Sequence, residues 1–269
     1  MSSAAREIAP AKLNLALHVR GKRPDGRHDI ETIFAFCTDG DRLSSEAADG
    51  ISLTLAGPFA SNLAADDNLV TTAAHALAAA ADIAKGAALS LDKQLPVASG
   101  IGGGSADAAA ALRLLTSLWQ IDPIHAADVA PTLGSDVPAC LLSLPMRGEG
   151  AGDRLTPIDL SELSGTPVLL VNPRVPLSTA GVFARWDGED RGPLGDWRDG
   201  RNDLEAPAIE LVPQIKTVLA WLGLQSGGTF VRMSGSGATC FALFDSEEAR
   251  DAAAMAVPRE WWHLATFLR

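Results

Sequence analysis

The sequence predicts an α+β fold in two lobes, and three observations lead to this class. Segments with the two-residue period of half-buried strands are mixed with alanine-rich helical segments, without the regular rhythm of βαβ units. The chain has 269 residues, 47% of them hydrophobic, which is enough for one large or two ordinary domains. A polar, glycine-rich segment, MRGEGAGDR at 146–154, interrupts the apolar pattern and predicts a boundary between domains 1–152 and 153–269.

The first half of the chain begins with strands. In KLNLALHV (12–19) apolar and polar residues alternate strictly, which predicts a strand with one buried and one polar face. GKRPDGRH (21–28) predicts a turn, and IETIFAFC (30–37) predicts a second strand that pairs with the first. Short strands are also predicted at ISLTL (51–55) and ALSLDK (88–93), and helices at about 68–84, 105–119 and 124–131.

The second half of the chain mixes both kinds of element. PVLLVNP (167–173) predicts a buried strand, and the segment 205–224 is mostly helical in pattern despite its two prolines. TFVRMSGSGATCFALF (229–244) predicts a strand, a glycine loop and another strand.

The charge and the cysteines exclude several classes of protein. A net charge of −11 argues against binding to nucleic acid or to an anionic membrane, and no apolar run approaches membrane-spanning length. Residues 1–30 hold six basic and three acidic side chains and so carry +3, which suits either a pocket for a small anion or a solvated loop. The polar start of the chain is unlike a targeting peptide, so we expect a cytoplasmic protein. Three widely spaced cysteines predict buried thiols rather than disulfides or a zinc site: Cys37, Cys140 and Cys240.

The segment LPVASGIGGGSADAAA (95–110) places four glycines just before a helical run. It is not a P-loop, because no Lys follows the glycines, and it lacks the GxGxxG dinucleotide pattern, because Ser105 stands where the third Gly belongs. Glycines allow positive φ, and a helix that begins near Ser105 or Ala106 points free N–H groups at the loop. This arrangement predicts an anion site, best suited to phosphate; the alternative is a flexible linker with Ser105 as the helix N-cap.

Four segments together resemble the galactokinase, homoserine kinase, mevalonate kinase and phosphomevalonate kinase (GHMP) superfamily. The segment 95–110 is similar to its phosphate-binding motif, and its doubled glycines resemble those of the 4-diphosphocytidyl-2-C-methyl-D-erythritol kinases. The resemblance implies a two-lobed GHMP kinase fold with the active site in the cleft between an ATP-binding, catalytic domain (1–152) and a substrate-binding domain (153–269). The other three segments agree in order and spacing: PAKLNLALHVRGKRPDGRHDIETIF (10–34), TLGSDVPACL (132–141) and VRMSGSGATCFALF (231–244).

The resemblance also implies the reaction. ATP would phosphorylate the 2-hydroxyl of 4-diphosphocytidyl-2-C-methyl-D-erythritol, a small-molecule substrate of the non-mevalonate isoprenoid pathway, with Mg²⁺ as a second cofactor. The ion would bind mainly phosphate oxygens and water, because the sequence has no dense carboxylate cluster, and no residue is predicted as a metal ligand. Two alternatives remain: a superfamily kinase for mevalonate, homoserine or a sugar, and a nucleotide-binding protein without catalysis. The oligomeric state is not predicted.

The resemblance implies two catalytic residues and a set of ATP-binding residues. Asp136 would orient the acceptor hydroxyl and take its proton, and Lys12 would lie beside it. From the residues alone, a turn or cap Asp and a solvent-facing strand Lys are the favoured interpretations. Asn68 and Lys93 would contact adenine, although a helix N-cap and an exposed strand-end Lys are equally good interpretations. The loop around the ATP phosphates would comprise Pro96, Val97, Ala98, Ser99, Gly100, Ile101, Gly102, Gly103, Gly104, Ser105 and Ala106.

The substrate site follows from the same resemblance. His28 would read the cytosine, with Phe183 as one wall of its slot and Thr179 nearby, and Asn14 would bind either the erythritol part or the catalytic pair of Lys12 and Asp136. The family pattern Gly-Tyr-His is broken here, because Arg27 takes the place of the Tyr and the chain contains no Tyr at all. A planar guanidinium can stack on a base, so Arg27 is predicted to substitute for that ring. The segment MSGSGA (233–238) would form a second glycine loop facing the first.

Overall fold

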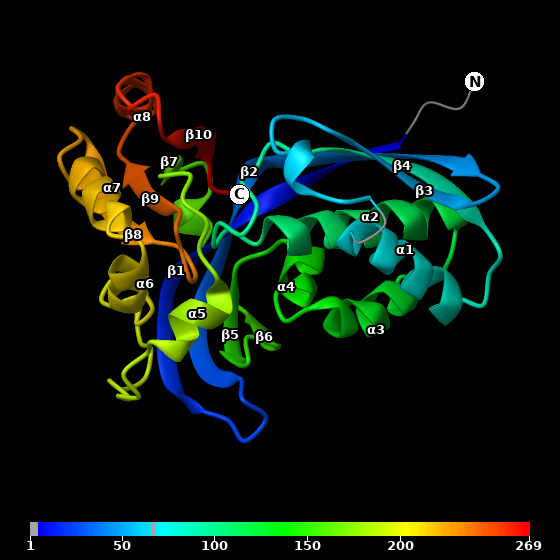
Figure 1. Ribbon diagram of the computed structural model, residues 1–269, viewed down its shortest axis with the longest axis horizontal. Coiled ribbons are helices and arrows are strands. Elements are labelled where there is room, and N and C mark those ends of the chain that lie inside the picture. The colour runs from blue at the N-terminus through cyan, green and yellow to red at the C-terminus, as the bar shows by residue number, and fades with distance from the viewer. Residues whose placement is uncertain (1–4, 66–67) are drawn as a thin grey trace. The chain divides into compact units, whose positions relative to one another are not determined.

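The computed structural model describes residues 5–65 and 68–269 and shows an α+β fold (Figure 1). The chain forms two compact units, which are described separately. Unit 1 contains Met1–Ala11, Asp39–Val97 and Gly102–Ser143, and unit 2 contains Lys12–Thr38, Ala98–Ile101 and Leu144–Arg269. Strands β1 (Ala5–Lys22) and β2 (His28–Ala48) each run from one unit into the other. The division into domains 1–152 and 153–269 stays a prediction.

Unit 1 is a sheet with helices on one side. Strand β4 (Gly86–Asp92) pairs parallel with β3 (Ile51–Ala56) and antiparallel with the second half of β2. Leu89 and Leu91 of β4 are buried and Ser90 between them is exposed, as the two-residue period requires, and in β2 Leu43 is buried beside the exposed Arg42. Figure 1 shows the helices α1 (Leu69–Ala80), α2 (Gly103–Trp119), α3 (Ile124–Leu133) and α4 (Val137–Leu142) grouped together; a short 3₁₀ helix, Ala60–Asn62, precedes them.

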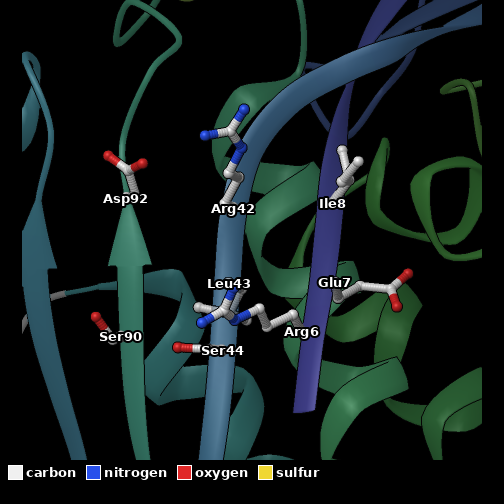
Figure 2. A pocket seen from close by; sticks show the side chains of 8 residues that line it. All are labelled: Arg6, Glu7, Ile8, Arg42, Leu43, Ser44, Ser90 and Asp92. Carbon is white, nitrogen blue, oxygen red and sulfur yellow. The ribbon is translucent and has the colours of Figure 1, made fainter. Parts of the chain in front are cut away.

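The alanine-rich sequence of α2 explains its central position in unit 1. Its residues Ala108–Leu112 are completely buried, because small side chains let the neighbouring helices α1 and α4 approach closely. A cavity of about 480 Å³ lies on the opposite face of the sheet. Figure 2 shows the side chains of β1, β2 and β4 that line it. The polar side chains on this face include Arg6, Arg42, Ser44 and Ser90.

Unit 2 contains the first half of β2 and a second sheet. β2 pairs antiparallel with β5 (Met146–Gly150), which pairs with β6 (Arg154–Pro157). The second sheet has the order β10-β7-β9-β8, with α7 and α8 packed against it (Figure 1). Its strands are β7 (Pro167–Asn172), β8 (Gly228–Met233), β9 (Cys240–Phe244) and β10 (Trp262–Phe267). The helices are α5 (Thr179–Ala184), α6 (Glu205–Leu211), α7 (Gln214–Gly223) and α8 (Glu247–Met255), and a 3₁₀ helix covers Ser161–Leu163.

Several local predictions are confirmed, and the structure adds detail to two segments. The cysteines are free and buried, and no helix of the described residues has the length and apolarity needed to cross a membrane. The glycine-rich segment at 146–154, predicted as a domain boundary, contains β5 and the start of β6, which pair antiparallel. The segment 205–224 is mostly helical, as predicted, but it forms two helices, because α6 ends before Pro213 and α7 begins after it, as expected where proline removes a backbone donor.

Candidate active site

The glycine-rich loop between β4 and α2 has an unusual backbone. Ala98, Gly100 and Gly102 have φ angles of 50°, 78° and 66°, in the left-handed region that glycine adopts without strain. Helix α2 begins at Gly103, two residues before the predicted start, and its first internal hydrogen bond runs from Ala106 N–H to Gly102 O at 2.8 Å. Ser105 therefore lies in the first turn and is not the N-cap. The helix supplies no acceptor for the N–H groups of this turn, so they suit an anion.

A second glycine loop, at 234–239, contacts residues 98–101 within unit 2. The Ser234 hydroxyl donates to Gly100 O at 3.0 Å, and Thr239 N–H donates to Ser99 O at 3.1 Å. A Cβ atom on Gly100 would lie 2.5 Å from Ser234 O, so the two loops approach too closely for any side chain at that position. The predicted MSGSGA loop thus holds the middle of the first glycine loop.

Lys12 and Asn14 lie together on β1. The Lys12 ammonium donates to Asn14 Oδ1 at 2.8 Å and lies 5.2 Å from the centre of the Phe34 ring, in the range of a cation–π contact. Asn14 in turn donates through Nδ2 to Thr32 Oγ1 at 2.7 Å. Lys12 is only 3% exposed, so it is not a solvent-facing strand residue, and Asn14 fixes the direction of its ammonium.

Asp136 occupies the N-cap position of the short helix α4. Its main-chain carbonyl accepts from Cys140 N–H at 3.0 Å, but its carboxylate makes no capping hydrogen bond to the helix. The side chain is half-buried. Asp136 belongs to unit 1 and Lys12 to unit 2, and their joint catalytic role stays a prediction.

Three aromatic rings gather at the start of β2 and at α5 in unit 2. The rings of His28 and Phe183 are stacked with centroids 4.8 Å apart, and Trp186 meets His28 edge-on at 5.7 Å. Burial and the nearby Lys22 lower the pKa of His28, so its ring is neutral at pH 7 and can both donate and accept a hydrogen bond. We call His28, Phe183 and Trp186 the aromatic cluster. Thr179 lies at the start of α5, where its hydroxyl is 2.9 Å from that of Ser236.

Both predicted adenine-binding residues have structural tasks in unit 1. Asn68 is the N-cap of α1, and its Oδ1 accepts from Val70 N–H at 3.0 Å. Lys93 is not an exposed strand-end residue: it is 2% exposed, and its ammonium lies 2.5 Å from Asp41 and 2.6 Å from Asp107. Contact of Asn68 or Lys93 with adenine stays a prediction, and the structure gives each of them another function.

Comparison with known proteins identifies the family. Residues 68–143 match the GHMP kinases N terminal domain, and residues 188–263 match the GHMP kinases C terminal model. A 4-diphosphocytidyl-2-C-methyl-D-erythritol kinase of Rhizorhabdus wittichii is 54% identical over 98% of this chain and 94% of its own length. The chain belongs to the 4-diphosphocytidyl-2-C-methyl-D-erythritol kinase family. One of Novosphingobium aromaticivorans is 50% identical over 98% of this chain and 93% of its own length.

Solved structures agree with this family. The crystal structure of a 4-(cytidine 5'-diphospho)-2C-methyl-D-erythritol kinase is 33% identical and matches with a TM-score of 0.85 over 98% of this chain and 99% of that one. A homoserine kinase from Cytophaga hutchinsonii, 16% identical, matches with a TM-score of 0.74 over 100% of this chain and 96% of that one. This second likeness shows the GHMP kinase fold alone.

Arg27 stands where the family pattern Gly-Tyr-His has its Tyr, and the structure shows what its side chain contacts. Its guanidinium donates to Asp25 Oδ2 at 2.8 and 3.0 Å, and its side chain is 58% exposed. These contacts hold Arg27 to its own turn and give no support to stacking on a base. Trp186, which the sequence analysis missed, supplies an aromatic ring beside His28 instead. Trp186 lies two residues beyond the end of α5, and no sequence pattern marks it.

The contacts of Asp41 and Asp107 with Lys93 were not predicted from the sequence. Both are almost completely buried and bind the same ammonium, that of Lys93. No sequence signal marks Asp41, which lies in an ordinary strand. Asp107 carried a weak signal, because a lone acidic residue sits between alanines on the buried side of α2.

Proposed function

We propose that this chain transfers the γ-phosphoryl group of ATP to the 2-hydroxyl of 4-diphosphocytidyl-2-C-methyl-D-erythritol, in the cytoplasm. The observation that carries the proposal is the 54% identity, over 98% of the chain, with a relative that bears this enzyme's name. The reaction forms a bond between the hydroxyl oxygen and the γ-phosphorus, breaks the bond from that phosphorus to the β,γ-bridging oxygen, and releases ADP.

In this proposal, positioning and charge neutralisation provide most of the catalysis, because phosphoryl transfer passes through a loose transition state. Asp136 orients the acceptor hydroxyl and takes its proton late in the reaction. Lys12 polarises the same hydroxyl, and its hydrogen bond to Asn14 at 2.8 Å supports this role, since it fixes the ammonium before substrate binds.

The glycine loop would hold the ATP phosphates through main-chain N–H groups, with the Ser105 hydroxyl nearby. The left-handed residues Ala98, Gly100 and Gly102 support this assignment, as does the start of a long helix at Gly103. Over residues 5–65 and 68–269, no three His, Cys, Asp or Glu side chains are grouped to hold a metal ion. Such a chain fits a Mg²⁺ ion held by phosphate oxygens and water rather than by protein side chains, and the ion would neutralise phosphate charge there.

The cytidyl end of the substrate would bind at the aromatic cluster. The rings of His28 and Phe183 are already stacked on each other, with centroids 4.8 Å apart. A base would therefore stack on an outer face of this pair. The neutral His28 ring can both donate to and accept from the base edge, as cytosine requires. The buried indole N–H of Trp186 has no acceptor among the described residues, which supports a ligand contact there. Thr179 and Asn14 would bind the remainder of the substrate.

The test measures ADP release with magnesium-ATP and, separately, 4-diphosphocytidyl-2-C-methyl-D-erythritol, mevalonate and homoserine. We expect turnover with the first acceptor only, and turnover with mevalonate or homoserine alone would contradict the proposal. Asp136→Asn should lower kcat by roughly 10²- to 10⁴-fold while ATP still binds. Asp128→Asn, an exposed aspartate on the neighbouring helix α3, is the matched control and should keep full activity.

A further inference from the structure

Three ionisable side chains of unit 1 are buried together next to the glycine loop. Lys93 Nζ donates to Asp41 Oδ2 at 2.5 Å and to Asp107 Oδ2 at 2.6 Å. Their exposures are 2%, 0% and 3%. We call these residues the Lys93 cluster.

The Lys93 cluster contacts the chain on both sides of the glycine loop. Asp41 Oδ1 accepts the N–H groups of Gln94 and Leu95, at 2.6 and 2.8 Å, and these two residues lead directly into the loop. Asp107 lies in the first turns of α2, just after the loop. The ammonium of Lys93 therefore connects the carboxylate that holds the start of the loop to the carboxylate on the helix that follows it.

The first residue of α2 also packs on this ammonium. A Cβ atom built on Gly103 would lie 3.1 Å from Lys93 Nζ, which is closer than almost all real contacts of this kind. The helix start and the lysine head group are thus fixed against each other.

A buried cluster of this kind is not explained by stability alone. Two carboxylates share one ammonium, and Asp107 Oδ1 has no hydrogen-bond partner among the described residues. Burial raises the pKa of Asp107 to about 8, although Lys93 opposes the increase. Well-packed apolar side chains often replace buried ion pairs without loss of stability, so a geometric role is the better explanation.

We propose that the Lys93 cluster positions the glycine loop for ATP by fixing residues 94–95 relative to the first turn of α2. Asp41, Lys93 and Asp107 are positioning residues, which act through the backbone of the loop. A loop rich in glycine has many conformations, and holding both of its ends reduces the conformational entropy that nucleotide binding would otherwise remove. The inference rests on the proposed function for the identity of the ligand, ATP.

The test compares two substitutions of Asp107. Asp107→Leu removes the acceptor on the helix side, fills similar space and leaves Lys93 paired with Asp41. We expect a 10- to 100-fold higher KM for ATP, an unchanged KM for the cytidyl substrate and little change in melting temperature. Asp107→Asn keeps an acceptor oxygen for Lys93 and should restore the KM for ATP to within about threefold of wild type.

The matched control removes another ion pair of the same helix. Arg113 of α2 binds Glu7 at 2.7 Å, two turns away from the loop. Glu7→Met breaks this pair and should leave the KM for ATP unchanged. The inference is overturned if Asp107→Leu has the wild-type KM for ATP, if Asp107→Asn is impaired as much as Asp107→Leu, or if Glu7→Met raises the KM for ATP equally.

A calorimetric titration with a non-hydrolysable ATP analogue separates failure of the inference from failure of the proposed function. If the wild-type protein binds no ATP analogue and releases no ADP, the proposed function is wrong. If wild type binds the analogue and Asp107→Leu binds it equally well, only the positioning role is wrong. Should Asp107→Leu not fold, Asp107→Ser takes its place, because its hydroxyl is too short to reach Lys93; the same loss of affinity is expected, and wild-type affinity overturns the inference.

Discussion

The buried carboxyl of Asp107 makes the stability of this protein depend on pH in a specific direction. Its pKa is about 8 in the folded chain, because burial outweighs the attraction of Lys93, against about 3.9 for an unfolded aspartate. Between these values the folded state holds a proton that the unfolded state has released. The free energy of unfolding therefore falls as pH rises through this window, by at most about 1.4 kcal/mol per pH unit for one group. Asp107→Asn has no such proton.

The assay is urea unfolding of wild type and Asp107→Asn at pH 5 to 9, followed by tryptophan fluorescence. The free energy of unfolding of Asp107→Asn, minus that of wild type, should rise from pH 5 to about pH 8 and then level off. Taking the difference cancels the contributions of His18 and His28, whose pKa values are lowered by burial in both proteins. A difference that is constant or falls with pH would refute the reasoning. Glu7→Gln, which removes a partly exposed carboxylate, should run parallel to wild type.

Three further substitutions test separate parts of the site. Gly100→Ala should lower kcat/KM for ATP at least tenfold, measured by ADP release, because the new Cβ atom would lie 2.5 Å from Ser234 O. Gly195→Ala is the control and should have no effect, since a Cβ atom at that position would have no other atom within 4 Å. Trp186→Ala should raise the KM for the cytidyl substrate by about 5- to 100-fold and leave that for ATP unchanged, since stacking on a base contributes about 1–3 kcal/mol. Asn14→Ala should lower kcat about 10- to 100-fold with the KM for ATP unchanged, because Lys12 loses its oriented partner.

The sequence predicted the elements that carry a regular pattern. The alternation at 12–19 and 30–37 lies within β1 and β2, and the helical runs at 105–119 and 124–131 lie within α2 and α3. The run predicted at 68–84 contains α1, which ends four residues earlier, at Ala80. The start of α2 was misplaced because glycine is a poor helix former, whereas here two glycines form its first turn. The hairpin of β5 and β6 was not predicted, because glycine is more typical of a linker than of a strand. Gly148 is nevertheless required inside β5, since a Cβ atom there would lie 2.7 Å from the Phe34 ring.

The candidate site was predictable only where several residues share one motif. The glycine loop, Asp136 and Lys12 belong to segments whose order and spacing carry information. The aromatic cluster and the Lys93 cluster depend on side chains that the fold brings together from distant positions, such as Asp41 and Asp107. From the sequence alone, an isolated Asp in a helix or a Lys at a strand end is best interpreted as a solvated side chain.

If ATP binds at the glycine loop as proposed, the Lys93 cluster would prevent Lys93 from acting as the lysine of a P-loop does. A P-loop lysine brings a positive charge to the phosphates, whereas the ammonium of Lys93 is bound by the carboxyl groups of Asp41 and Asp107 within 2.6 Å. With all three groups ionised the cluster is net negative and would repel an ATP phosphate. The raised pKa of Asp107 removes this repulsion, because its carboxyl carries a proton at neutral pH and the cluster is then neutral. In the proposed mechanism, the positive charge for phosphoryl transfer must therefore come from the N-terminus of α2, from Mg²⁺ on the nucleotide and from Lys12.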